Sequence, residues 1–213
     1  MKKTTKWALI GCGGIIFAAV GCKMLVCAFQ EKPPKRGFPI ETLLIDVSVF
    51  PEGWAASPEG PQMIRAPAAP LGSDSIPAIE STALLFLRRL PGGSGYASHA
   101  VYRLQNRQEA FNEFQIRKKR WFPMGQYDTP WTTPPELAFQ NLVANQFYVA
   151  CSIQGSIPLC QMLAQYEEYL TVFGASMGAY DSNLQLIQVL TYTDFRRVVT
   201  AVDQKMGYYL KPH

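Results

Sequence analysis

Histidine is nearly absent from this chain, and cysteine is scarce outside one apolar stretch near the start. The 213 residues include two histidines, His99 and His213, and only Cys151 and Cys160 among the five cysteines lie beyond residue 27. A structural zinc site needs about four ligands, and a catalytic thiol needs a nearby base. We therefore expect no metal and no cofactor, and we interpret His99, which lies in a predicted strand, as a structural residue.

The chain also lacks an excess of positive charge outside its first residues. Residues 1–37 hold seven Lys or Arg and one acidic residue, so the formal net charge of +4 leaves residues 38–213 with −2. A nucleic-acid-binding domain normally carries its own positive field. We therefore expect no nucleic-acid partner.

One long apolar run stands near the start of the chain. Three lysines precede an apolar stretch over residues 7–29 that only Lys23 interrupts. At 1.5 Å per helical residue, this length is enough to cross a hydrocarbon core of about 30 Å. The pattern predicts an N-terminal membrane anchor over residues 1–29, a stalk over 30–37 and one domain over 38–213.

Two other interpretations of the apolar run stay open. A cleaved secretory signal has the same basic start and apolar centre. The sequence Ala19-Val20-Gly21-Cys22 resembles a bacterial lipobox, in which the cysteine is lipidated, although leucine is usual where Ala19 stands. The run continues past Cys22 to Phe29, which favours an uncleaved single span.

The orientation of this span rests on the cysteines. Basic residues flank the span on both sides, so the positive-inside rule gives little asymmetry. Cys151 and Cys160 lie on either side of Gly155 and Pro158, a spacing that suits a disulfide across a short turn in an oxidising compartment. Two buried thiols in a reduced protein are the alternative. With the signal-like start, the pair predicts a domain on the extracytoplasmic side of the cell membrane.

Strand and helix patterns alternate along the rest of the chain. The apolar segment 41–50 opens the domain, and prolines and glycines over 51–77 indicate an irregular surface segment. The elements expected after it are a hairpin with strands over 81–89 and 96–105, a helix from Asn106 to Arg120, a strand pair over 146–153 and 160–176, and a helix over 193–210. This order predicts an α+β domain, in which two main helices pack on a face of an antiparallel sheet.

Several segments together carry a resemblance: LLIDVSVFPEGW, HAVYRLQNRQEAFNEF, the Cys151 and Cys160 pair, QYEEYLTVF and TYTDFRRVVTAVDQKMGYYL. With these segments the chain resembles a family of uncharacterised single-pass membrane-anchored bacterial ectodomain proteins. The resemblance implies a membrane-anchored ectodomain but brings no known activity, ligand or site. By analogy, its fold is similar to small α/β ectodomains of the PsbP-like or PknH-sensor kind.

One motif is typical of serine hydrolases. Gly174-Ala175-Ser176-Met177-Gly178 matches G-x-S-x-G, the turn that presents a nucleophilic serine to a histidine base. Here the only downstream histidine is His213, and no HGGG-type oxyanion segment lies upstream. A turn between two elements is the simpler interpretation.

Two further features bear on binding. The basic run Arg117 to Arg120 could contact anionic headgroups or end a helix in solvent, and the second interpretation is simpler. Trp54, Trp121 and Trp131 lie in segments predicted as irregular and would either line a groove or pack beneath those segments. We therefore expect a non-enzymatic binding domain whose partner is a small ligand or an envelope protein, with a serine hydrolase using Ser176 as the alternative.

Overall fold

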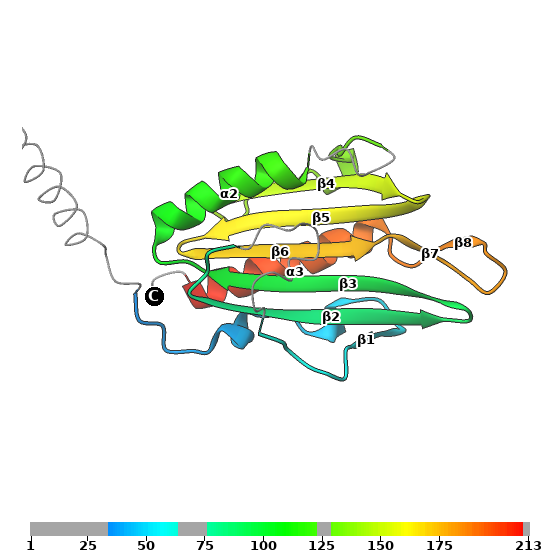
Figure 1. The fold of residues 1–213 in the computed structure, drawn as a ribbon, viewed down its shortest axis with the longest axis horizontal. Coiled ribbons are helices and arrows are strands. Elements are labelled where there is room, and N and C mark those ends of the chain that lie inside the picture. Colours follow the sequence, from blue (N-terminus) through cyan, green and yellow to red (C-terminus); the bar gives the residue numbers. More distant parts are fainter. Residues whose placement is uncertain (1–33, 64–75, 123–128, 211–213) are drawn as a thin grey trace, which may run out of the picture. The chain divides into compact units, whose positions relative to one another are not determined.

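The computed structural model of the protein describes residues 34–63, 76–122 and 129–210, which all belong to the compact unit Pro33–His213 (Figure 1). The predicted anchor over residues 1–29 and the first part of the predicted stalk lie outside the described residues. Within the described ranges, no helix has the length and apolar character needed to cross a membrane.

An antiparallel sheet of six strands forms the centre of the domain (Figure 1). In spatial order the strands are β1 (Trp54–Ala56), β2 (Glu80–Leu90), β3 (Gly93–Arg103), β6 (Tyr169–Ser176), β5 (Ile157–Tyr166) and β4 (Gln146–Gln154). Each strand pairs with its neighbour in the antiparallel sense. The predicted α+β class with an antiparallel sheet is confirmed.

The first predicted hairpin is formed by β2 and β3. Their register runs without interruption from Glu80 opposite Arg103 to Leu90 opposite Gly93. Pro91 and Gly92 make the turn between the strands, and Gly92 has a φ of +78°. Glycine adopts this left-handed conformation without steric cost, which explains why a local signal located the hairpin. The second strand begins at Gly93 and not at residue 96 as predicted, so the turn is shorter than the sequence indicated.

The strand predicted over residues 160–176 is two strands, β5 and β6, which form a hairpin of their own. Glu167 lies in the turn with a φ of +50°. Its N–H donates to Asn145 Oδ1 at 2.7 Å, and its carbonyl accepts from Gln165 Nε2 at 2.8 Å. Side chains from outside the turn thus stabilise a bend that contains neither glycine nor proline, so turn composition could not reveal it.

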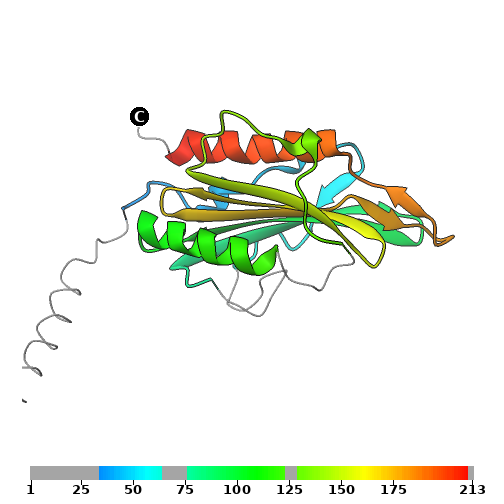
Figure 2. The ribbon, with the colours of Figure 1, turned by 90° about the horizontal axis from the view of Figure 1, so that it is seen from above.

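The two helices lie on opposite faces of the sheet rather than on one, as Figure 2 shows. Helix α2 (Arg107–Trp121) packs on β4, β5 and β6, and α3 (Tyr192–Leu210) packs on the other face. Each has a side-chain cap at its N-terminus: Asn106 Oδ1 accepts from Glu109 N at 2.9 Å, and Thr191 Oγ1 accepts from Asp194 N at 3.0 Å. The last helix therefore begins slightly earlier than predicted.

Apolar side chains on each face of the sheet form a separate core. The core beneath α3 includes Phe86, Met162, Phe173, Phe195 and Val198, and the core beneath α2 includes Leu104, Phe114, Leu163, Leu170 and Val172. Both faces of the central strands are buried, because each strand alternates its side chains between the two cores.

The apolar segment that opens the domain forms two short 3₁₀ helices, η1 (Ile40–Leu43) and η2 (Val47–Val49). Both contact α3, and Leu44 and Ile45 between them are buried in the same core. The segment predicted as irregular contains the edge strand β1 and an isolated bridge from Gln62 to Ala83. A third 3₁₀ turn, η3 (Pro135–Leu137), contacts α3 from the loop after α2.

Candidate binding site

Cys151 and Cys160, the predicted disulfide pair, are joined in the structure. They stand directly opposite one another on β4 and β5, with a distance of 4.0 Å between their Cα atoms. Thr132 exchanges two main-chain hydrogen bonds with the outer side of Cys151, at 2.9 and 2.7 Å. The disulfide thus links two strands near the edge of the sheet, as the spacing predicted.

Ser176 of the G-x-S-x-G motif has a structural partner for its hydroxyl group. Its Oγ accepts from Tyr96 N at 3.0 Å and donates to Tyr96 O at 3.2 Å, and the residue is buried. These two bonds continue the pairing of β3 with β6 by one position beyond Ala97 and Ala175. The serine therefore extends the sheet, and its hydroxyl is engaged on both sides.

His99 is fully buried on β3 and connects three segments. Its Nδ1 accepts from Ile45 N at 3.1 Å, so the proton lies on Nε2, which donates to Thr171 Oγ1 at 2.8 Å. The Thr171 hydroxyl in turn donates to Ala100 O at 3.0 Å. Burial, with a smaller effect from the charge of Lys205, lowers the pKa of His99 to about 3. The imidazole is thus a neutral structural group.

The three tryptophans considered as groove-lining residues do not come together. Trp54 is buried in the core beneath α3, with its ring centroid 5.1 Å from that of Phe50. Trp121 and Trp131 belong to the core beneath α2, where Trp131 lies 5.2 Å from Phe122. Because the sheet separates the two cores, these residues pack beneath their segments and line no common groove.

The basic run at the end of α2 is only partly exposed. Arg117 is 3% exposed and its Nε lies 2.9 Å from Glu113 Oε2, while its guanidinium stacks on Trp121 at 5.5 Å. Lys118 Nζ lies 4.7 Å from the ring centroid of Tyr148. The run therefore contains one buried cation, Arg117, followed by exposed ones, and it does not form a single exposed patch of four cations.

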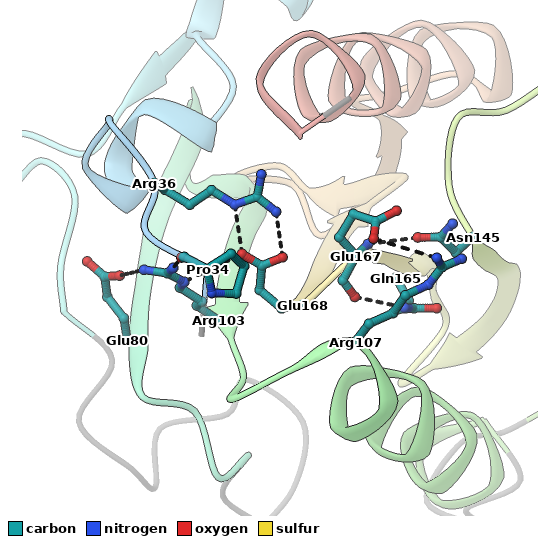
Figure 3. Close-up of polar contacts among 9 residues, drawn as sticks. All are labelled: Pro34, Arg36, Glu80, Arg103, Arg107, Asn145, Gln165, Glu167 and Glu168. Atoms are coloured by element: carbon teal, nitrogen blue, oxygen red, sulfur yellow. Dashed lines mark hydrogen bonds and ion pairs between the residues drawn. The ribbon is translucent and has the colours of Figure 1, made fainter. Parts of the chain in front are cut away.

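A buried carboxylate at the β5–β6 turn binds the first described residues of the chain (Figure 3). Glu168 is 2% exposed, and Arg36 donates to its two oxygens at 2.8 and 2.6 Å. Arg103 Nε lies 3.7 Å from the same carboxylate and its guanidinium donates to Pro34 O. The Tyr169 ring contacts both guanidinium groups, and burial raises the pKa of Tyr169 to about 12. Residues 34 to 36, predicted as stalk, thus contact the domain.

The charges around this turn compensate one another. Arg103 also lies 3.5 Å from Glu80, and Arg107 lies 3.7 Å from Glu167 (Figure 3). Three arginines therefore face three glutamates, which leaves little net field to attract an ion. We interpret this cluster as a structural connection.

The buried Asp203 on α3 is likewise satisfied. Its carboxylate accepts from Tyr166 Oη at 2.9 Å and from the main-chain N–H groups of Val143, at 3.1 and 2.9 Å, and Ala144, at 3.1 Å. Burial, followed by the nearby carboxylate charge, raises the pKa of Tyr166. These bonds hold the loop before β4 against α3.

An apolar cavity lies beside the second, smaller sheet. This sheet is the hairpin β7 (Gly178–Tyr180) and β8 (Leu186–Gln188), which projects beyond the end of β6 (Figure 1). The cavity has a volume of about 260 Å³ and is lined by both strands of the hairpin and by Pro158, Met177 and Tyr192. None of the described residues that line it carries a charge at neutral pH.

Gly178, the last residue of the motif, lines this cavity and packs closely against β8. A Cβ atom at this position would come within 3.0 Å of Leu186 Cδ1 and 3.3 Å of Ile187 O. Met177 N also donates to Pro158 O at 2.8 Å, which joins the start of the hairpin to β5. The two residues after Ser176 thus shape the cavity, although the motif suggested catalysis.

The hairpin presents apolar side chains to solvent. Leu184, near its tip, is 80% exposed, and Leu186 is 44% exposed. Main-chain contacts fix the hairpin on the β2–β3 turn, because Ser182 N donates to Pro91 O at 2.8 Å. A Cβ on Gly93 would lie 1.9 Å from Tyr180 O, so only glycine allows this approach. The exposed leucines therefore lie on a hairpin whose position is fixed by main-chain contacts with the β2–β3 turn.

Sequence reasoning did not identify this cavity. Its walls come from β5, the hairpin and the start of α3, which are separated along the chain and meet only through tertiary packing. The one local signal is the pair of leucines in a polar segment, Leu184 and Leu186, a few residues after the motif. Such a pair is unexpected in a solvated loop.

No group of histidine, cysteine and acidic side chains suited to a metal ion occurs in the described part of the chain. Comparison of the chain with protein families, with curated proteins and with solved structures finds no match.

Proposed function

We propose that this protein is a membrane-tethered, non-enzymatic binding domain that acts on the extracytoplasmic side of the cell membrane. The apolar run over residues 7–29 supports the tether, and the disulfide between Cys151 and Cys160 supports an oxidising compartment. The resemblance to single-pass bacterial ectodomain proteins is consistent with both. Its partner is an envelope protein rather than a small ligand, for the reasons that follow.

The observation that carries the binding proposal is the hairpin β7–β8 with its cavity. Leu184 and Leu186 expose apolar surface beside an uncharged cavity, and contacts with the β2–β3 turn and with Pro158 fix the hairpin. Exposed apolar surface of this kind marks interaction sites on soluble domains, and it favours a protein partner over a small ligand that would be enclosed in a groove. A preformed apolar surface also gains affinity, because little conformational freedom is lost on binding.

The polar residues that could have served catalysis support this proposal over the alternative. Ser176 and His99 both bind main-chain groups of neighbouring segments, and their partners are different residues. A nucleophilic serine requires a base within hydrogen-bond reach and an accessible hydroxyl. These contacts therefore favour structural roles for both side chains.

Site-specific photo-crosslinking in intact cells tests the proposed binding surface. A photoreactive amino acid replaces Leu184 on the hairpin, and the same amino acid at Tyr208, an exposed residue on α3, provides the matched control. We expect protein adducts at Leu184, none at Tyr208, and loss of the adducts when Leu186→Asp places a charge beside the cavity. Equal adducts at both positions, or no adducts, would contradict the proposal.

A further inference from the structure

We infer that the β8 edge and the adjoining cavity bind an extended polypeptide segment of a protein partner. The segment adds a strand to β8 through main-chain hydrogen bonds and places one uncharged apolar side chain in the cavity. This inference rests on the proposed function, because it specifies the chemistry of the partner at the same surface.

The register of the hairpin shows which main-chain groups face outward. Asp181 N donates to Gln185 O at 3.0 Å, and Val189 N donates to Met177 O at 2.9 Å. Hydrogen-bonded and non-hydrogen-bonded pairs alternate along an antiparallel ladder. Leu186 and Gln188 therefore occupy non-hydrogen-bonded positions opposite Tyr180 and Gly178, and their N–H and C=O groups point away from β7.

These outward groups form an open strand edge. Leu186 is 44% exposed and Gln188 is also exposed, and no hydrogen bond within the described part of the chain engages their main-chain groups. An open edge matches the donors and acceptors of another extended chain, which is the basis of recognition by strand addition. The open edge therefore favours a polypeptide ligand over an apolar molecule that has no main-chain donors and acceptors.

The size and the charge of the cavity agree with this occupant. At about 260 Å³ the cavity is smaller than sites for drug-sized ligands, which begin at about 300 Å³. Its described walls carry no charge, and burying a charged or unpaired polar group there would be costly. Side chains alternate along a strand, so one apolar side chain of the added segment can enter while its neighbours face away. Because Leu186 and Gln188 also line the cavity, the edge and the cavity form one continuous site.

A library of random peptides displayed on phage provides the probe. The full-length chain in lipid nanodiscs is the target, and the Gly178→Ala variant, whose added Cβ meets Leu186, is the comparison target. Gly174→Ala is the matched control, since a Cβ there has only ordinary contacts at 3.9 Å. We expect enriched peptides that share one aliphatic position and bind Gly178→Ala about tenfold more weakly, with no loss for Gly174→Ala.

Two measurements then test the main-chain pairing. Gln188→Pro removes an outward N–H, whereas Gln188→Ala keeps it, and proline is tolerated on a strand edge whose N–H faces solvent. We expect a loss of roughly fivefold to tenfold for the proline variant alone. Independently of how that variant folds, N-methylation of the selected peptide at single positions should weaken binding at every second residue, because only alternate N–H groups face β8.

The outcomes separate this inference from the proposed function. An absence of enriched peptides, or binding that N-methylation leaves unchanged, would overturn strand addition, while Leu186-dependent crosslinks at Leu184 would still support a binding surface. If neither peptide binding nor crosslinks at Leu184 are observed, both strand addition and the proposed binding surface are overturned. Self-association of the free chain in ultracentrifugation, abolished by Gln188→Pro, would identify a second copy as the occupant and would likewise overturn the inference.

Discussion

The buried imidazole of His99 provides a sharp test of the fold through its dependence on pH. The side chain is fully buried and binds Ile45 N and Thr171 Oγ1 in its neutral form. Replacement by asparagine keeps an acceptor at the position of Nδ1 for the Ile45 N–H but removes the group that titrates. His99→Asn therefore separates the structural contact from the protonation equilibrium.

The expected magnitude follows from the two pKa values. Burial lowers the pKa of His99 from 6.5 to about 3. Below pH 6.5 the unfolded chain binds a proton at this residue, while the folded domain does not until about pH 3, so the free energy of unfolding falls as the pH falls. Each pH unit in this window is worth up to about 1.4 kcal/mol, so acidification from pH 7 to pH 4 removes roughly 3 kcal/mol.

Urea denaturation of the full-length chain, followed by tryptophan fluorescence with the disulfide intact, measures this effect. At pH 7 the asparagine variant is expected to be less stable than the wild type by about 1–3 kcal/mol, because the bond to Thr171 is lost in a buried site. As the pH falls to 4, the wild type is expected to lose roughly 3 kcal/mol that the variant keeps, so that the difference disappears or changes sign, since the variant has no histidine here to titrate. Carboxylates titrate in both proteins and cancel in the comparison. A stability difference that stays constant over this pH range would refute the assignment of His99 as a buried neutral group.

In intact cells, Cys151 and Cys160 are expected to resist alkylation until reductant is added. Mass spectrometry of the unreduced chain is expected to yield one peptide that links them. Two free thiols would contradict both the disulfide and the extracytoplasmic location. Glu168→Gln should lower the free energy of unfolding by roughly 3 kcal/mol in chemical denaturation, because the Arg36 guanidinium loses its buried partner. A loss below about 1 kcal/mol, as for an exposed ion pair, would show that the Arg36–Glu168 contact contributes little to stability. Ser176→Ala should lower stability by about 1–2 kcal/mol through the loss of two hydrogen bonds to β3, and neither it nor the wild type should react with a fluorophosphonate probe. Labelling of the wild type alone would instead support the hydrolase.

Local signals in the sequence were sufficient for several elements of the fold. The Asn106 cap, with Glu109 three residues later, located the start of α2, and Glu109 Oε2 also accepts from Gln105 N at 3.3 Å. The proline and glycine between β2 and β3 located the first hairpin, and apolar residues at helical spacing identified α3. These signals work because the interactions that they report lie within a few residues of one another.

Other elements depended on partners far along the chain. The β5–β6 turn is stabilised by Asn145 and Gln165 rather than by its own composition. The opening segment is apolar because it covers the core beneath α3. It is buried there as two short 3₁₀ helices and not as a strand. A sheet buried on both faces gives a nearly continuous apolar pattern, which does not reveal which face each helix covers.

The sequence by itself determined the class of the fold and most of the strand and helix positions, because periodicity, caps and turns are short-range properties. It favoured a disulfide between Cys151 and Cys160 over two buried thiols. Only the tertiary structure decided that α2 and α3 occupy opposite faces, that Ser176 extends the sheet, and that Met177 and Gly178 line a cavity. Each of these depends on which residues meet across the sheet. Contacts of this kind arise from packing between distant segments, and no local pattern specifies them.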